Sequence, residues 1–227
     1  MKRDIITAAI GIVFFALFCG IVYPLAITGV SQVAFPGNAN GQQVFVQGKL
    51  VGSKIIGQSF EYQVGNKVTS TKGPLLKPEV KYFQTRPSST GEPYVNGGTP
   101  DNAAGTAFSN LGPNSVLTET VIAGNIAAYV ELDKAPGGTP YYPGALTPGT
   151  VPVDAVDSSG SAIDPEISVR NADIQAYRVA AVRHLALATV DKLISTYTAG
   201  RGLGFSGEPG VNVLELNLAL DRLTRGS

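Results

Sequence analysis

The chain has 227 residues, and its 17 basic side chains balance its 17 acidic ones, so no electropositive surface for nucleic acid is expected. A single cysteine, Cys19, excludes an intrachain disulfide, and with only one histidine, His184, no zinc site of the usual kind can be assembled. The 27 glycines, the 15 prolines and the lack of tryptophan predict a domain rich in turns.

An apolar segment opens the chain. No charged residue occurs between Asp4 and Lys49, and residues 5–30 are almost wholly apolar. A helix that crosses a hydrocarbon core about 30 Å thick needs about 20 apolar residues, which residues 5–23 nearly provide. Pro24 is expected to kink this helix or to end it near the far interface. The segment is therefore predicted to span a membrane once.

The charges that flank the segment predict its orientation. Lys2 and Arg3 precede it, and the next basic residue, Lys49, comes well after it, so the N-terminus is expected in the cytoplasm. Residues 1–35 are then a single-pass anchor in the inner (plasma) membrane, and residues 36–227 form one soluble extracytoplasmic domain. A cleaved signal peptide is the weaker alternative, because the uncharged run is too long and offers only a poor cleavage site.

Small residues in the segment suit helix packing. Ala16 and Gly20 would let the backbone of a neighbouring helix approach closely, whereas lipid-facing filler is the plainer interpretation. A lipoprotein acylated at Cys19 is disfavoured, because Leu17 and Phe18 before it are bulky.

The first half of the soluble part predicts strands and one helix. Residues 44–51 indicate a hairpin that turns at Gln47-Gly48, and residues 55–56 and 80–85 are candidate short strands. The stretch 87–165 holds 21 glycines or prolines in 79 residues and is predicted to be mostly loop. One helix interrupts it at residues 116–132, with its apolar residues on one broad face.

The last third predicts helices and a final strand. Ser168 is a good N-cap for one long helix, or for two in succession, that ends near Gly200. Leucines at 214, 216, 218 and 220 alternate with other residues, which favours a half-buried strand, although so many leucines also suit a helix. The predicted fold class is therefore α+β, a mixed α/β domain behind one transmembrane helix.

Motifs for catalysis are not found. The sequence has neither a Gly-x-Ser-x-Gly elbow nor a Walker A loop. Residues 158–161 are rich in serine but predict a turn, and a lone His184 on a helix is more typical of a packing or surface residue than of a ligand. No catalytic or metal-binding residue is predicted, and no cofactor-binding residue is identified.

A series of short motifs nevertheless occurs in a recognisable order. They are Tyr23-Pro24-Leu25, Phe35-Pro36, Gly57-Gln58-Ser59-Phe60, Tyr82-Phe83-x-x-Arg86-Pro87-Ser88, Ser109-Asn110-Leu111-Gly112-Pro113, Val151-Pro152-Val153-Asp154, Asp164-Pro165, Gln175-x-x-Arg178-Val179 and Gly207-Glu208-Pro209-x-Val211-Asn212-Val213-Leu214-x-Leu216-Asn217-Leu218-Ala219-Leu220-Asp221. With these motifs, from the anchor to the C-terminus, the chain closely resembles the C subunit of the bacterial Kdp potassium-transporting ATPase.

The resemblance implies a non-catalytic subunit of a high-affinity potassium import pump. Its expected partners are the Kdp A subunit, which binds potassium, the B subunit, which hydrolyses ATP, the small F subunit, and membrane lipid. The family's C subunit supports assembly and is a catalytic chaperone for the B subunit. ATP and potassium are therefore expected at the level of the complex, and with the domain outside the cell any effect on nucleotide is expected to be indirect.

Two residues depart from the family pattern. Glu166 stands where the family usually has histidine after Asp-Pro, and Gly210 stands where arginine is common after Gly-Glu-Pro. Extra sequence also occurs around residues 92–107 and 135–149, which indicates surface insertions.

The motif residues are the candidates for interface or structural roles. They are Gly20, Pro24, Arg86, Asn110, Asp164, Gln175, Arg178, Glu208 and Asn212. Arg86 is expected to anchor a loop on Asp164 or Glu208, with a contact to the A subunit as the alternative. Asn110 and Asn212 are expected to satisfy turn backbones rather than to bind potassium.

Two interpretations stay open. Asp154 and Asp164 are expected to cap helices and turns, although an acidic entrance for potassium is the sharper alternative. For the whole protein, the rival is a membrane-anchored cell-envelope enzyme or binding module. The lack of tryptophan disfavours that rival, because such a protein would expose aromatics and paired carboxylates in a cleft.

Overall fold

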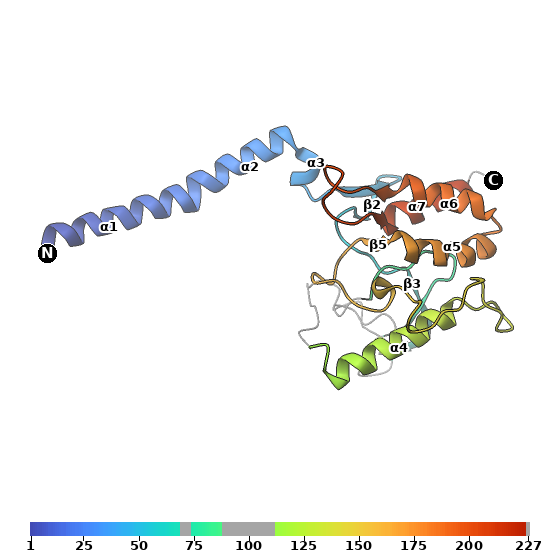
Figure 1. The fold of residues 1–227 in the computed structure, drawn as a ribbon. Coiled ribbons are helices and arrows are strands. Elements are labelled where there is room, and N and C mark those ends of the chain that lie inside the picture. The colour runs from blue at the N-terminus through green and yellow to red at the C-terminus, as the bar shows by residue number, and fades with distance from the viewer. Residues whose placement is uncertain (69–73, 88–111, 226–227) are drawn as a thin grey trace. The chain divides into compact units, whose positions relative to one another are not determined.

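The computed structural model describes residues 1–68, 74–87 and 112–225, and it divides the chain into two compact units, Met1–Ser53 and Lys54–Ser227 (Figure 1). The elements of the first unit are α1 (Lys2–Leu17), the π-helical turn η1 (Phe18–Val22), α2 (Tyr23–Ala34), α3 (Pro36–Ala39), β1 (Gln43–Val46) and β2 (Lys49–Ser53). The second unit is an α+β domain and is called the domain below.

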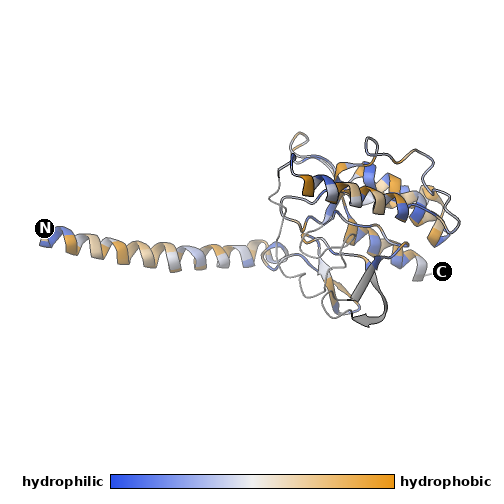
Figure 2. Ribbon diagram, turned by 90° about the horizontal axis from the view of Figure 1, so that it is seen from below, coloured by the Kyte–Doolittle hydropathy of each residue, from blue (hydrophilic) through white to orange (hydrophobic). Residues whose placement is uncertain are grey.

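The apolar segment forms a continuous helical run. It covers 33 residues from Lys2 to Ala34, has the length and composition of a membrane span, and buries no side chain within the structure. Figure 2 shows hydrophobic residues along this helix. Pro24 does not end it, because the turn before the proline widens and the N–H of Tyr23 bonds to the carbonyl of Phe18. A wider turn makes room for a ring that would otherwise meet the carbonyl four residues earlier.

The predicted hairpin is confirmed. Strands β1 and β2 pair antiparallel, with Val46 opposite Lys49. Gln47 and Gly48 both have positive φ angles, 51° and 76°, as a tight two-residue turn requires. The hairpin also closes on the chain before it, since Ser53 Oγ donates to the carbonyl oxygen of Gly41 at 2.6 Å.

The described part of the domain contains a small antiparallel sheet, a separate hairpin and four α-helices. The sheet has the strand order β5-β7-β6, and a separate hairpin pairs β3 with β4. The bounds are β3 (Glu61–Val68), β4 (Pro74–Pro78), α4 (Val116–Leu132), the 3-10 turn η3 (Val153–Ala155), β5 (Glu166–Ser168), α5 (Val169–Arg183), α6 (Leu187–Thr196), β6 (Thr198–Ala199), β7 (Gly210–Asn212) and α7 (Val213–Arg225).

Two strand predictions are wrong. Residues 55–56 lie in a turn and residues 80–85 lie in a loop, whereas β3 and β4 form the hairpin between them. Polar side chains of the helices explain why residues 80–85 form a loop. The backbone groups of the loop bond to these side chains, described below, and not to a neighbouring strand.

The last strand prediction is also wrong, and the alternative of a helix is confirmed. The Asn212 side chain accepts the N–H of Glu215 at 3.1 Å, which caps α7 at its start. Val213, Leu216 and Leu220 are fully buried at a helical spacing, whereas Leu218 is only half-buried. On a helix, residues three and four positions apart share one face. Burial of this face therefore overrides the alternating pattern of leucines that suggested a strand.

The two-helix alternative is the correct one for residues 168–197. Ser168 caps α5 as predicted, since its hydroxyl accepts the N–H of Asn171 at 3.1 Å. The helix ends at His184, an exposed residue with a left-handed φ of 54°, and α6 begins three residues later. His184 is thus a helix C-cap, which agrees with its interpretation as a surface residue.

The main core lies between the sheet and the helices α5, α6 and α7. Its buried residues are Phe83, Ile167, Ala172, Ala176, Val179, Ala180, Val190, Ile194, Val211, Val213, Leu216 and Leu220. A smaller cluster of Val151, Ala155 and Val156 receives Ile122, Ile126 and Tyr129 from α4. The broad apolar face predicted for α4 is only partly buried, because Leu117 and Val121 are exposed.

Candidate functional site

A network of buried polar side chains holds the loop that follows β4. The network consists of Asn171, Gln175 and Arg178 on α5 and Asn217 on α7, together with loop residues 79–87, and is called the polar clamp below. The three α5 residues are spaced by four and three positions, so they share one face of the helix. All four side chains are less than 5% exposed, so each needs partners inside the protein.

The side-chain amide of Gln175 bonds to both backbone groups, the N–H and the carbonyl, of one loop residue. Its Oε1 accepts the N–H of Gln84 at 2.8 Å, and its Nε2 donates to the carbonyl of Gln84 at 3.1 Å. Nε2 also donates to Oδ1 of Asn171 at 3.0 Å, which in turn accepts the hydroxyl of Tyr129 from α4 at 2.9 Å. The Gln84 side chain donates back to the carbonyls of Phe60 and Glu79.

Asn217 repeats this arrangement from α7. Its Oδ1 accepts the N–H of Phe83 at 2.9 Å, and its Nδ2 donates to the carbonyl of the same residue at 2.9 Å. The Phe83 side chain is fully buried in the main core. The two amides, Asn217 and Gln175, therefore act as side-chain substitutes for a neighbouring strand and fix two successive loop residues.

Arg178 is the one charged member of the clamp among its helix side chains, and a buried guanidinium needs hydrogen-bond partners to offset the cost of its burial. Its Nη1 donates to the carbonyls of Val80 and of Tyr82, the latter at 3.0 Å, and its Nη2 donates to Oε1 of Gln175 at 2.8 Å. The predicted motif Gln175-x-x-Arg178 is thus brought together in one place, and its role there is to shape the loop.

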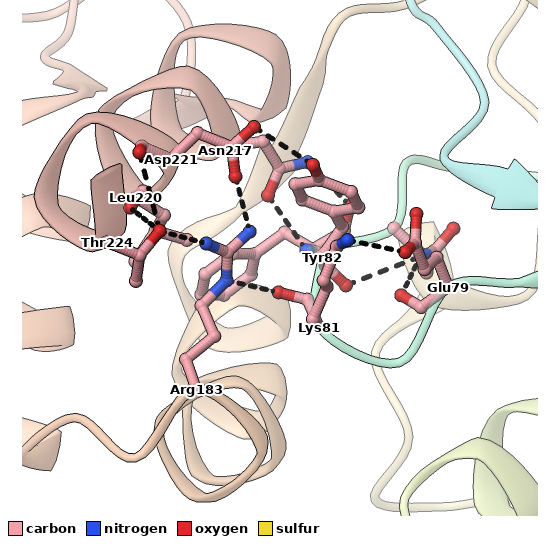
Figure 3. Close-up of polar contacts among 10 residues, drawn as sticks. Glu79, Lys81, Tyr82, Arg183, Asn217, Leu220, Asp221 and Thr224 are labelled. Atoms are coloured by element: carbon pink, nitrogen blue, oxygen red, sulfur yellow. Dashed lines mark hydrogen bonds and ion pairs between the residues drawn. The ribbon is translucent and has the colours of Figure 1, made fainter.

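A second group of charged residues contacts the start of the same loop (Figure 3). Arg183 donates to Asp221 at 2.9 Å and to the carbonyl of Lys81 at 2.7 Å, and its guanidinium lies 4.8 Å from the ring centre of Tyr82. The Tyr82 hydroxyl donates to Asp221 at 2.9 Å. Burial, followed by this hydrogen bond to a carboxylate, raises the pKa of Tyr82, so the phenol keeps its proton. Lys81 pairs with Glu79 at 2.7 Å, which raises the pKa of the lysine.

Arg86 anchors the far end of the loop on Asp164, as one of the two predicted alternatives. Its Nη1 lies 3.6 Å from the Asp164 carboxylate, and its Nη2 donates to the carbonyl of Ser158 at 3.2 Å. The other alternative is wrong, because Glu208 is exposed and pairs with Arg201 at 2.8 Å.

The aspartates and Asn212 serve the backbone. Asp164 accepts the N–H of Glu166, and Asp154 accepts both the N–H and the hydroxyl of Ser168, the cap of α5. Asn212 caps α7 and donates to the carbonyl of Lys54 at 2.8 Å. Caps and turns therefore account for these side chains, in line with the predictions for Asn212, Asp154 and Asp164.

The remaining candidates fall outside the clamp. Gly20 and Pro24 belong to the apolar helix of the first unit, where a Cβ on Gly20 would meet nothing within 4 Å. Asn110 lies outside the described residues, as does the insertion at 92–107. Within the second insertion, Tyr142 bonds through its N–H to the buried Asp133, whose pKa is raised chiefly by burial.

Glu166 and Gly210, the two residues predicted to depart from the family pattern, are neighbours in space. A Cβ on Gly210 would lie 2.5 Å from a carboxylate oxygen of Glu166 and 3.1 Å from its Cβ. The Glu166 side chain thus occupies the space next to β7 that a side chain at 210 would need. Burial, and then the charge of Asp164, raise the pKa of Glu166.

These contacts define what the site can do. Its amides, guanidinium groups and carboxylates bond to backbone groups or to one another and hold the loop at 79–87 in one shape. Among the described residues, no cluster of three or more His, Cys, Asp or Glu side chains is placed to hold a metal ion. The role that these contacts support is structural, because they fix the path of this loop against α5 and α7.

Sequence reasoning missed several members of the network. Asn171 and Arg183 were not named, and Tyr82, Asn217 and Asp221 stand in the quoted motifs without a role assigned to them. The signal was a stripe of polar residues, Asn171, Gln175 and Arg178, along one face of α5. Their apolar neighbours on the helix, such as Ala172 and Ala176, are also buried. Polar residues inside the apolar face of a helix predict a buried network.

Comparison with known proteins supplies the family. The chain matches the family described as "KdpC: K+-transporting ATPase, c chain" over residues 5–222. Relatives named potassium-transporting ATPase KdpC subunit are similar along nearly all their length. The protein of Mycobacterium tuberculosis (strain ATCC 25618 / H37Rv) is 41% identical over 223 residues, covering 98% of this chain and 100% of the relative. That of Rhodopseudomonas palustris (strain BisB5) is 39% identical over 230 residues, covering 99% and 100%.

A third relative, from Streptomyces avermitilis, is 39% identical over 216 residues, covering 92% of this chain and 88% of its own. A match that covers nearly the whole chain includes both the apolar helix and the polar clamp. The chain therefore belongs to the KdpC family, the c chains of K+-transporting ATPases.

Proposed function

We propose that this chain is a non-catalytic accessory subunit of a high-affinity, ATP-driven potassium import pump, and that it supports the assembly of the complex. The family match over residues 5–222 carries the proposal. The polar clamp supports it, because four buried polar side chains of the helices hold one loop of the domain in a fixed shape. A loop that is already held in one shape lowers the entropic cost of binding a partner.

The proposed partners are the Kdp A subunit, which binds potassium, the B subunit, which hydrolyses ATP, and the F subunit. ATP and potassium act at the level of this complex. The chain serves as a catalytic chaperone for the B subunit indirectly, through the membrane subunits. The orientation supports an indirect effect, because a domain on the far side of the membrane does not meet cytosolic nucleotide.

The proposed location is the plasma membrane, crossed once, with the N-terminus in the cytoplasm and the domain outside. The helical run Lys2–Ala34 has the length of a span, and Lys2 and Arg3 before it follow the positive-inside bias. Fusions to the C-terminus test the orientation. An active alkaline phosphatase fusion with a dark green fluorescent protein fusion is expected, and the reverse pattern would contradict the orientation.

Affinity purification from membranes tests the accessory role. The tagged chain is expected to bring down three membrane partners, and a strain without it is expected to lose both assembled complex and growth at limiting potassium. Arg183→Ala removes the outer bonds to Asp221 and to the carbonyl of Lys81, whereas Arg170→Ala, an exposed change on the same helix, provides the matched control. A chain that is purified alone, from cells that grow normally at low potassium, would favour a cell-envelope enzyme or binding module instead.

A further inference from the structure

An apolar tip projects from the loop between β6 and β7. Leu203 is 91% exposed and Phe205 is 75% exposed, although both belong to residue types that fold inward. The tip, defined as residues 203–205, lies between two strands that pair with each other in the sheet, β6 and β7. The sheet therefore fixes the base from which these two side chains project.

The loop holds the tip outward by its own bonds. Gly202 and Ser206 exchange two backbone hydrogen bonds, at 2.7 and 2.8 Å, so the tip is a closed turn. Leu203 and Gly204 have positive φ angles, 53° and 82°. A leucine is rarely found in this left-handed region, and such strain at an exposed position is typical of functional loops.

The flanks of the tip carry no net charge. Arg201 and Glu208, on either side of the turn, pair with each other at 2.8 and 2.9 Å. Two apolar side chains with a neutral collar suit the boundary between lipid headgroups and acyl chains, which accepts apolar groups without a shaped pocket. A tip of two side chains is far smaller than the roughly 800 Å² that each protein contributes to a stable interface.

The base of the loop lies beside the point where the domain begins. Asn212, which ends β7, donates to the carbonyl of Lys54, and Lys54 directly follows the hairpin of the first unit. That hairpin closes between Gly41 and Ser53. Only residues 35–40 separate this closure from the end of the apolar helix, so the chain tethers the domain with a short connection. A short tether raises the effective concentration of the domain at the membrane surface, so even a weak contact between the domain and the bilayer is formed most of the time.

We propose that the Leu203–Phe205 tip inserts into the surface of the phospholipid bilayer that anchors the chain. This inference rests on the proposed membrane anchoring. The tip gives the domain a second attachment to the bilayer, so it fixes the face that the domain turns to the membrane. A single tether alone leaves the domain free to rotate.

The chain has no tryptophan, so a single substitution provides a site-specific fluorophore. Phe205→Trp reports on the tip, Val13→Trp on the anchor, and Val153→Trp on an exposed site elsewhere in the domain. Each full-length variant is reconstituted into vesicles of phosphatidylethanolamine and phosphatidylglycerol, with or without lipids brominated on their acyl chains. The emission wavelength and the loss of emission by bromine are measured.

The proposal predicts that Phe205→Trp emits at shorter wavelength than Val153→Trp and loses emission in brominated vesicles, as Val13→Trp does. Adding Leu203→Asp to the Phe205→Trp chain is expected to reverse both effects. Aspartate tolerates a positive φ, so this change removes apolar surface without disturbing the turn.

Other outcomes overturn the proposal in distinguishable ways. If Val13→Trp is quenched but Phe205→Trp emits as in water, the tip does not touch lipid, while the proposed anchoring stands. A short-wavelength emission from Phe205→Trp without quenching would mean that protein covers the tip. If Val13→Trp is not quenched either, both the anchoring and the inference that rests on it fail.

Discussion

Two regions of the domain are held together in different ways. The sheet–helix core, formed by β5–β7 and α5–α7, buries twelve apolar residues around the polar clamp. The α4 layer, formed by α4 and residues 151–156, contains three buried apolar residues, and in the described part of the chain the one buried residue of α4 itself is the polar Asn125. The Asn125 amide bonds to the carbonyl of Val156 at 2.8 Å.

The difference shows where the stability of the domain resides. Burial of apolar surface and buried hydrogen bonds coincide in the sheet–helix core, so each substitution there removes several interactions at once. The α4 layer contacts that core through polar bonds, from Tyr129 to Asn171 and from Ser168 and Asn171 to Asp154. Equivalent substitutions should therefore cost more in the sheet–helix core than in the α4 layer.

The largest effect is expected for Arg178→Ala. The change leaves the carbonyls of Val80 and Tyr82 and the Gln175 side chain without their donor, and it opens a cavity in the clamp. The loss is expected to be about 3–5 kcal/mol in the free energy of unfolding, measured by urea unfolding of the full chain in detergent. Exposed Arg170→Ala on the same helix is the control, and an equal loss for both variants would contradict a role of the clamp in stability.

A pair of apolar truncations compares the two regions directly. Leu216→Ala removes a fully buried side chain from the sheet–helix core and is expected to cost about 2–5 kcal/mol. Ile126→Ala removes a half-buried side chain from the α4 layer and is expected to cost about 1–2 kcal/mol. The same unfolding measurement applies, and a larger loss for Ile126→Ala would reverse the proposed ranking.

Glycine substitutions test close approach at the edge of the core. A Cβ on Gly57 would lie 2.5 Å from the carbonyl oxygen of Asp164, which is backbone and cannot swing away. Gly57→Ala is expected to cost about 1–3 kcal/mol, and to disturb the Arg86 anchor on Asp164 as well. Gly160→Ala, where a Cβ meets nothing within 4 Å, is the matched control. A melting temperature unchanged by Gly57→Ala would show that this segment adapts freely.

The smallest effect concerns pH. Because burial and Asp164 raise the pKa of Glu166 above its unfolded value, ionisation of this carboxyl costs stability above that raised pKa. The cost is relieved as pH falls through the folded pKa towards the ordinary value. Glu166→Gln should therefore be more stable than the parent near neutral pH, with an advantage that shrinks on acidification. Melting curves across this range measure it, with exposed Glu131→Gln as the control, and an advantage that grows towards acid would refute the assignment.

Local signals in the sequence were sufficient for several elements. The apolar run from residue 5, the Gln47-Gly48 turn and the Ser168 cap each depend on neighbouring residues, and the structure contains the corresponding helix, hairpin and helix start. The pairing of Arg86 with Asp164 was also one of two predicted alternatives. The apolar run, the turn and the cap need only short-range chemistry: apolar length, positive φ and a hydroxyl cap.

Tertiary structure alone decided the rest. The period of two in residues 214–220 indicates a strand, but the cap by Asn212 and the burial of Val213, Leu216 and Leu220 against the core select a helix. The β-forming stretch 80–85 lies in a loop because Gln175 and Asn217, some 90 and 134 residues away in sequence, supply the hydrogen bonds that a strand would have offered. Such partners come together only when the chain folds, so no local pattern reports them.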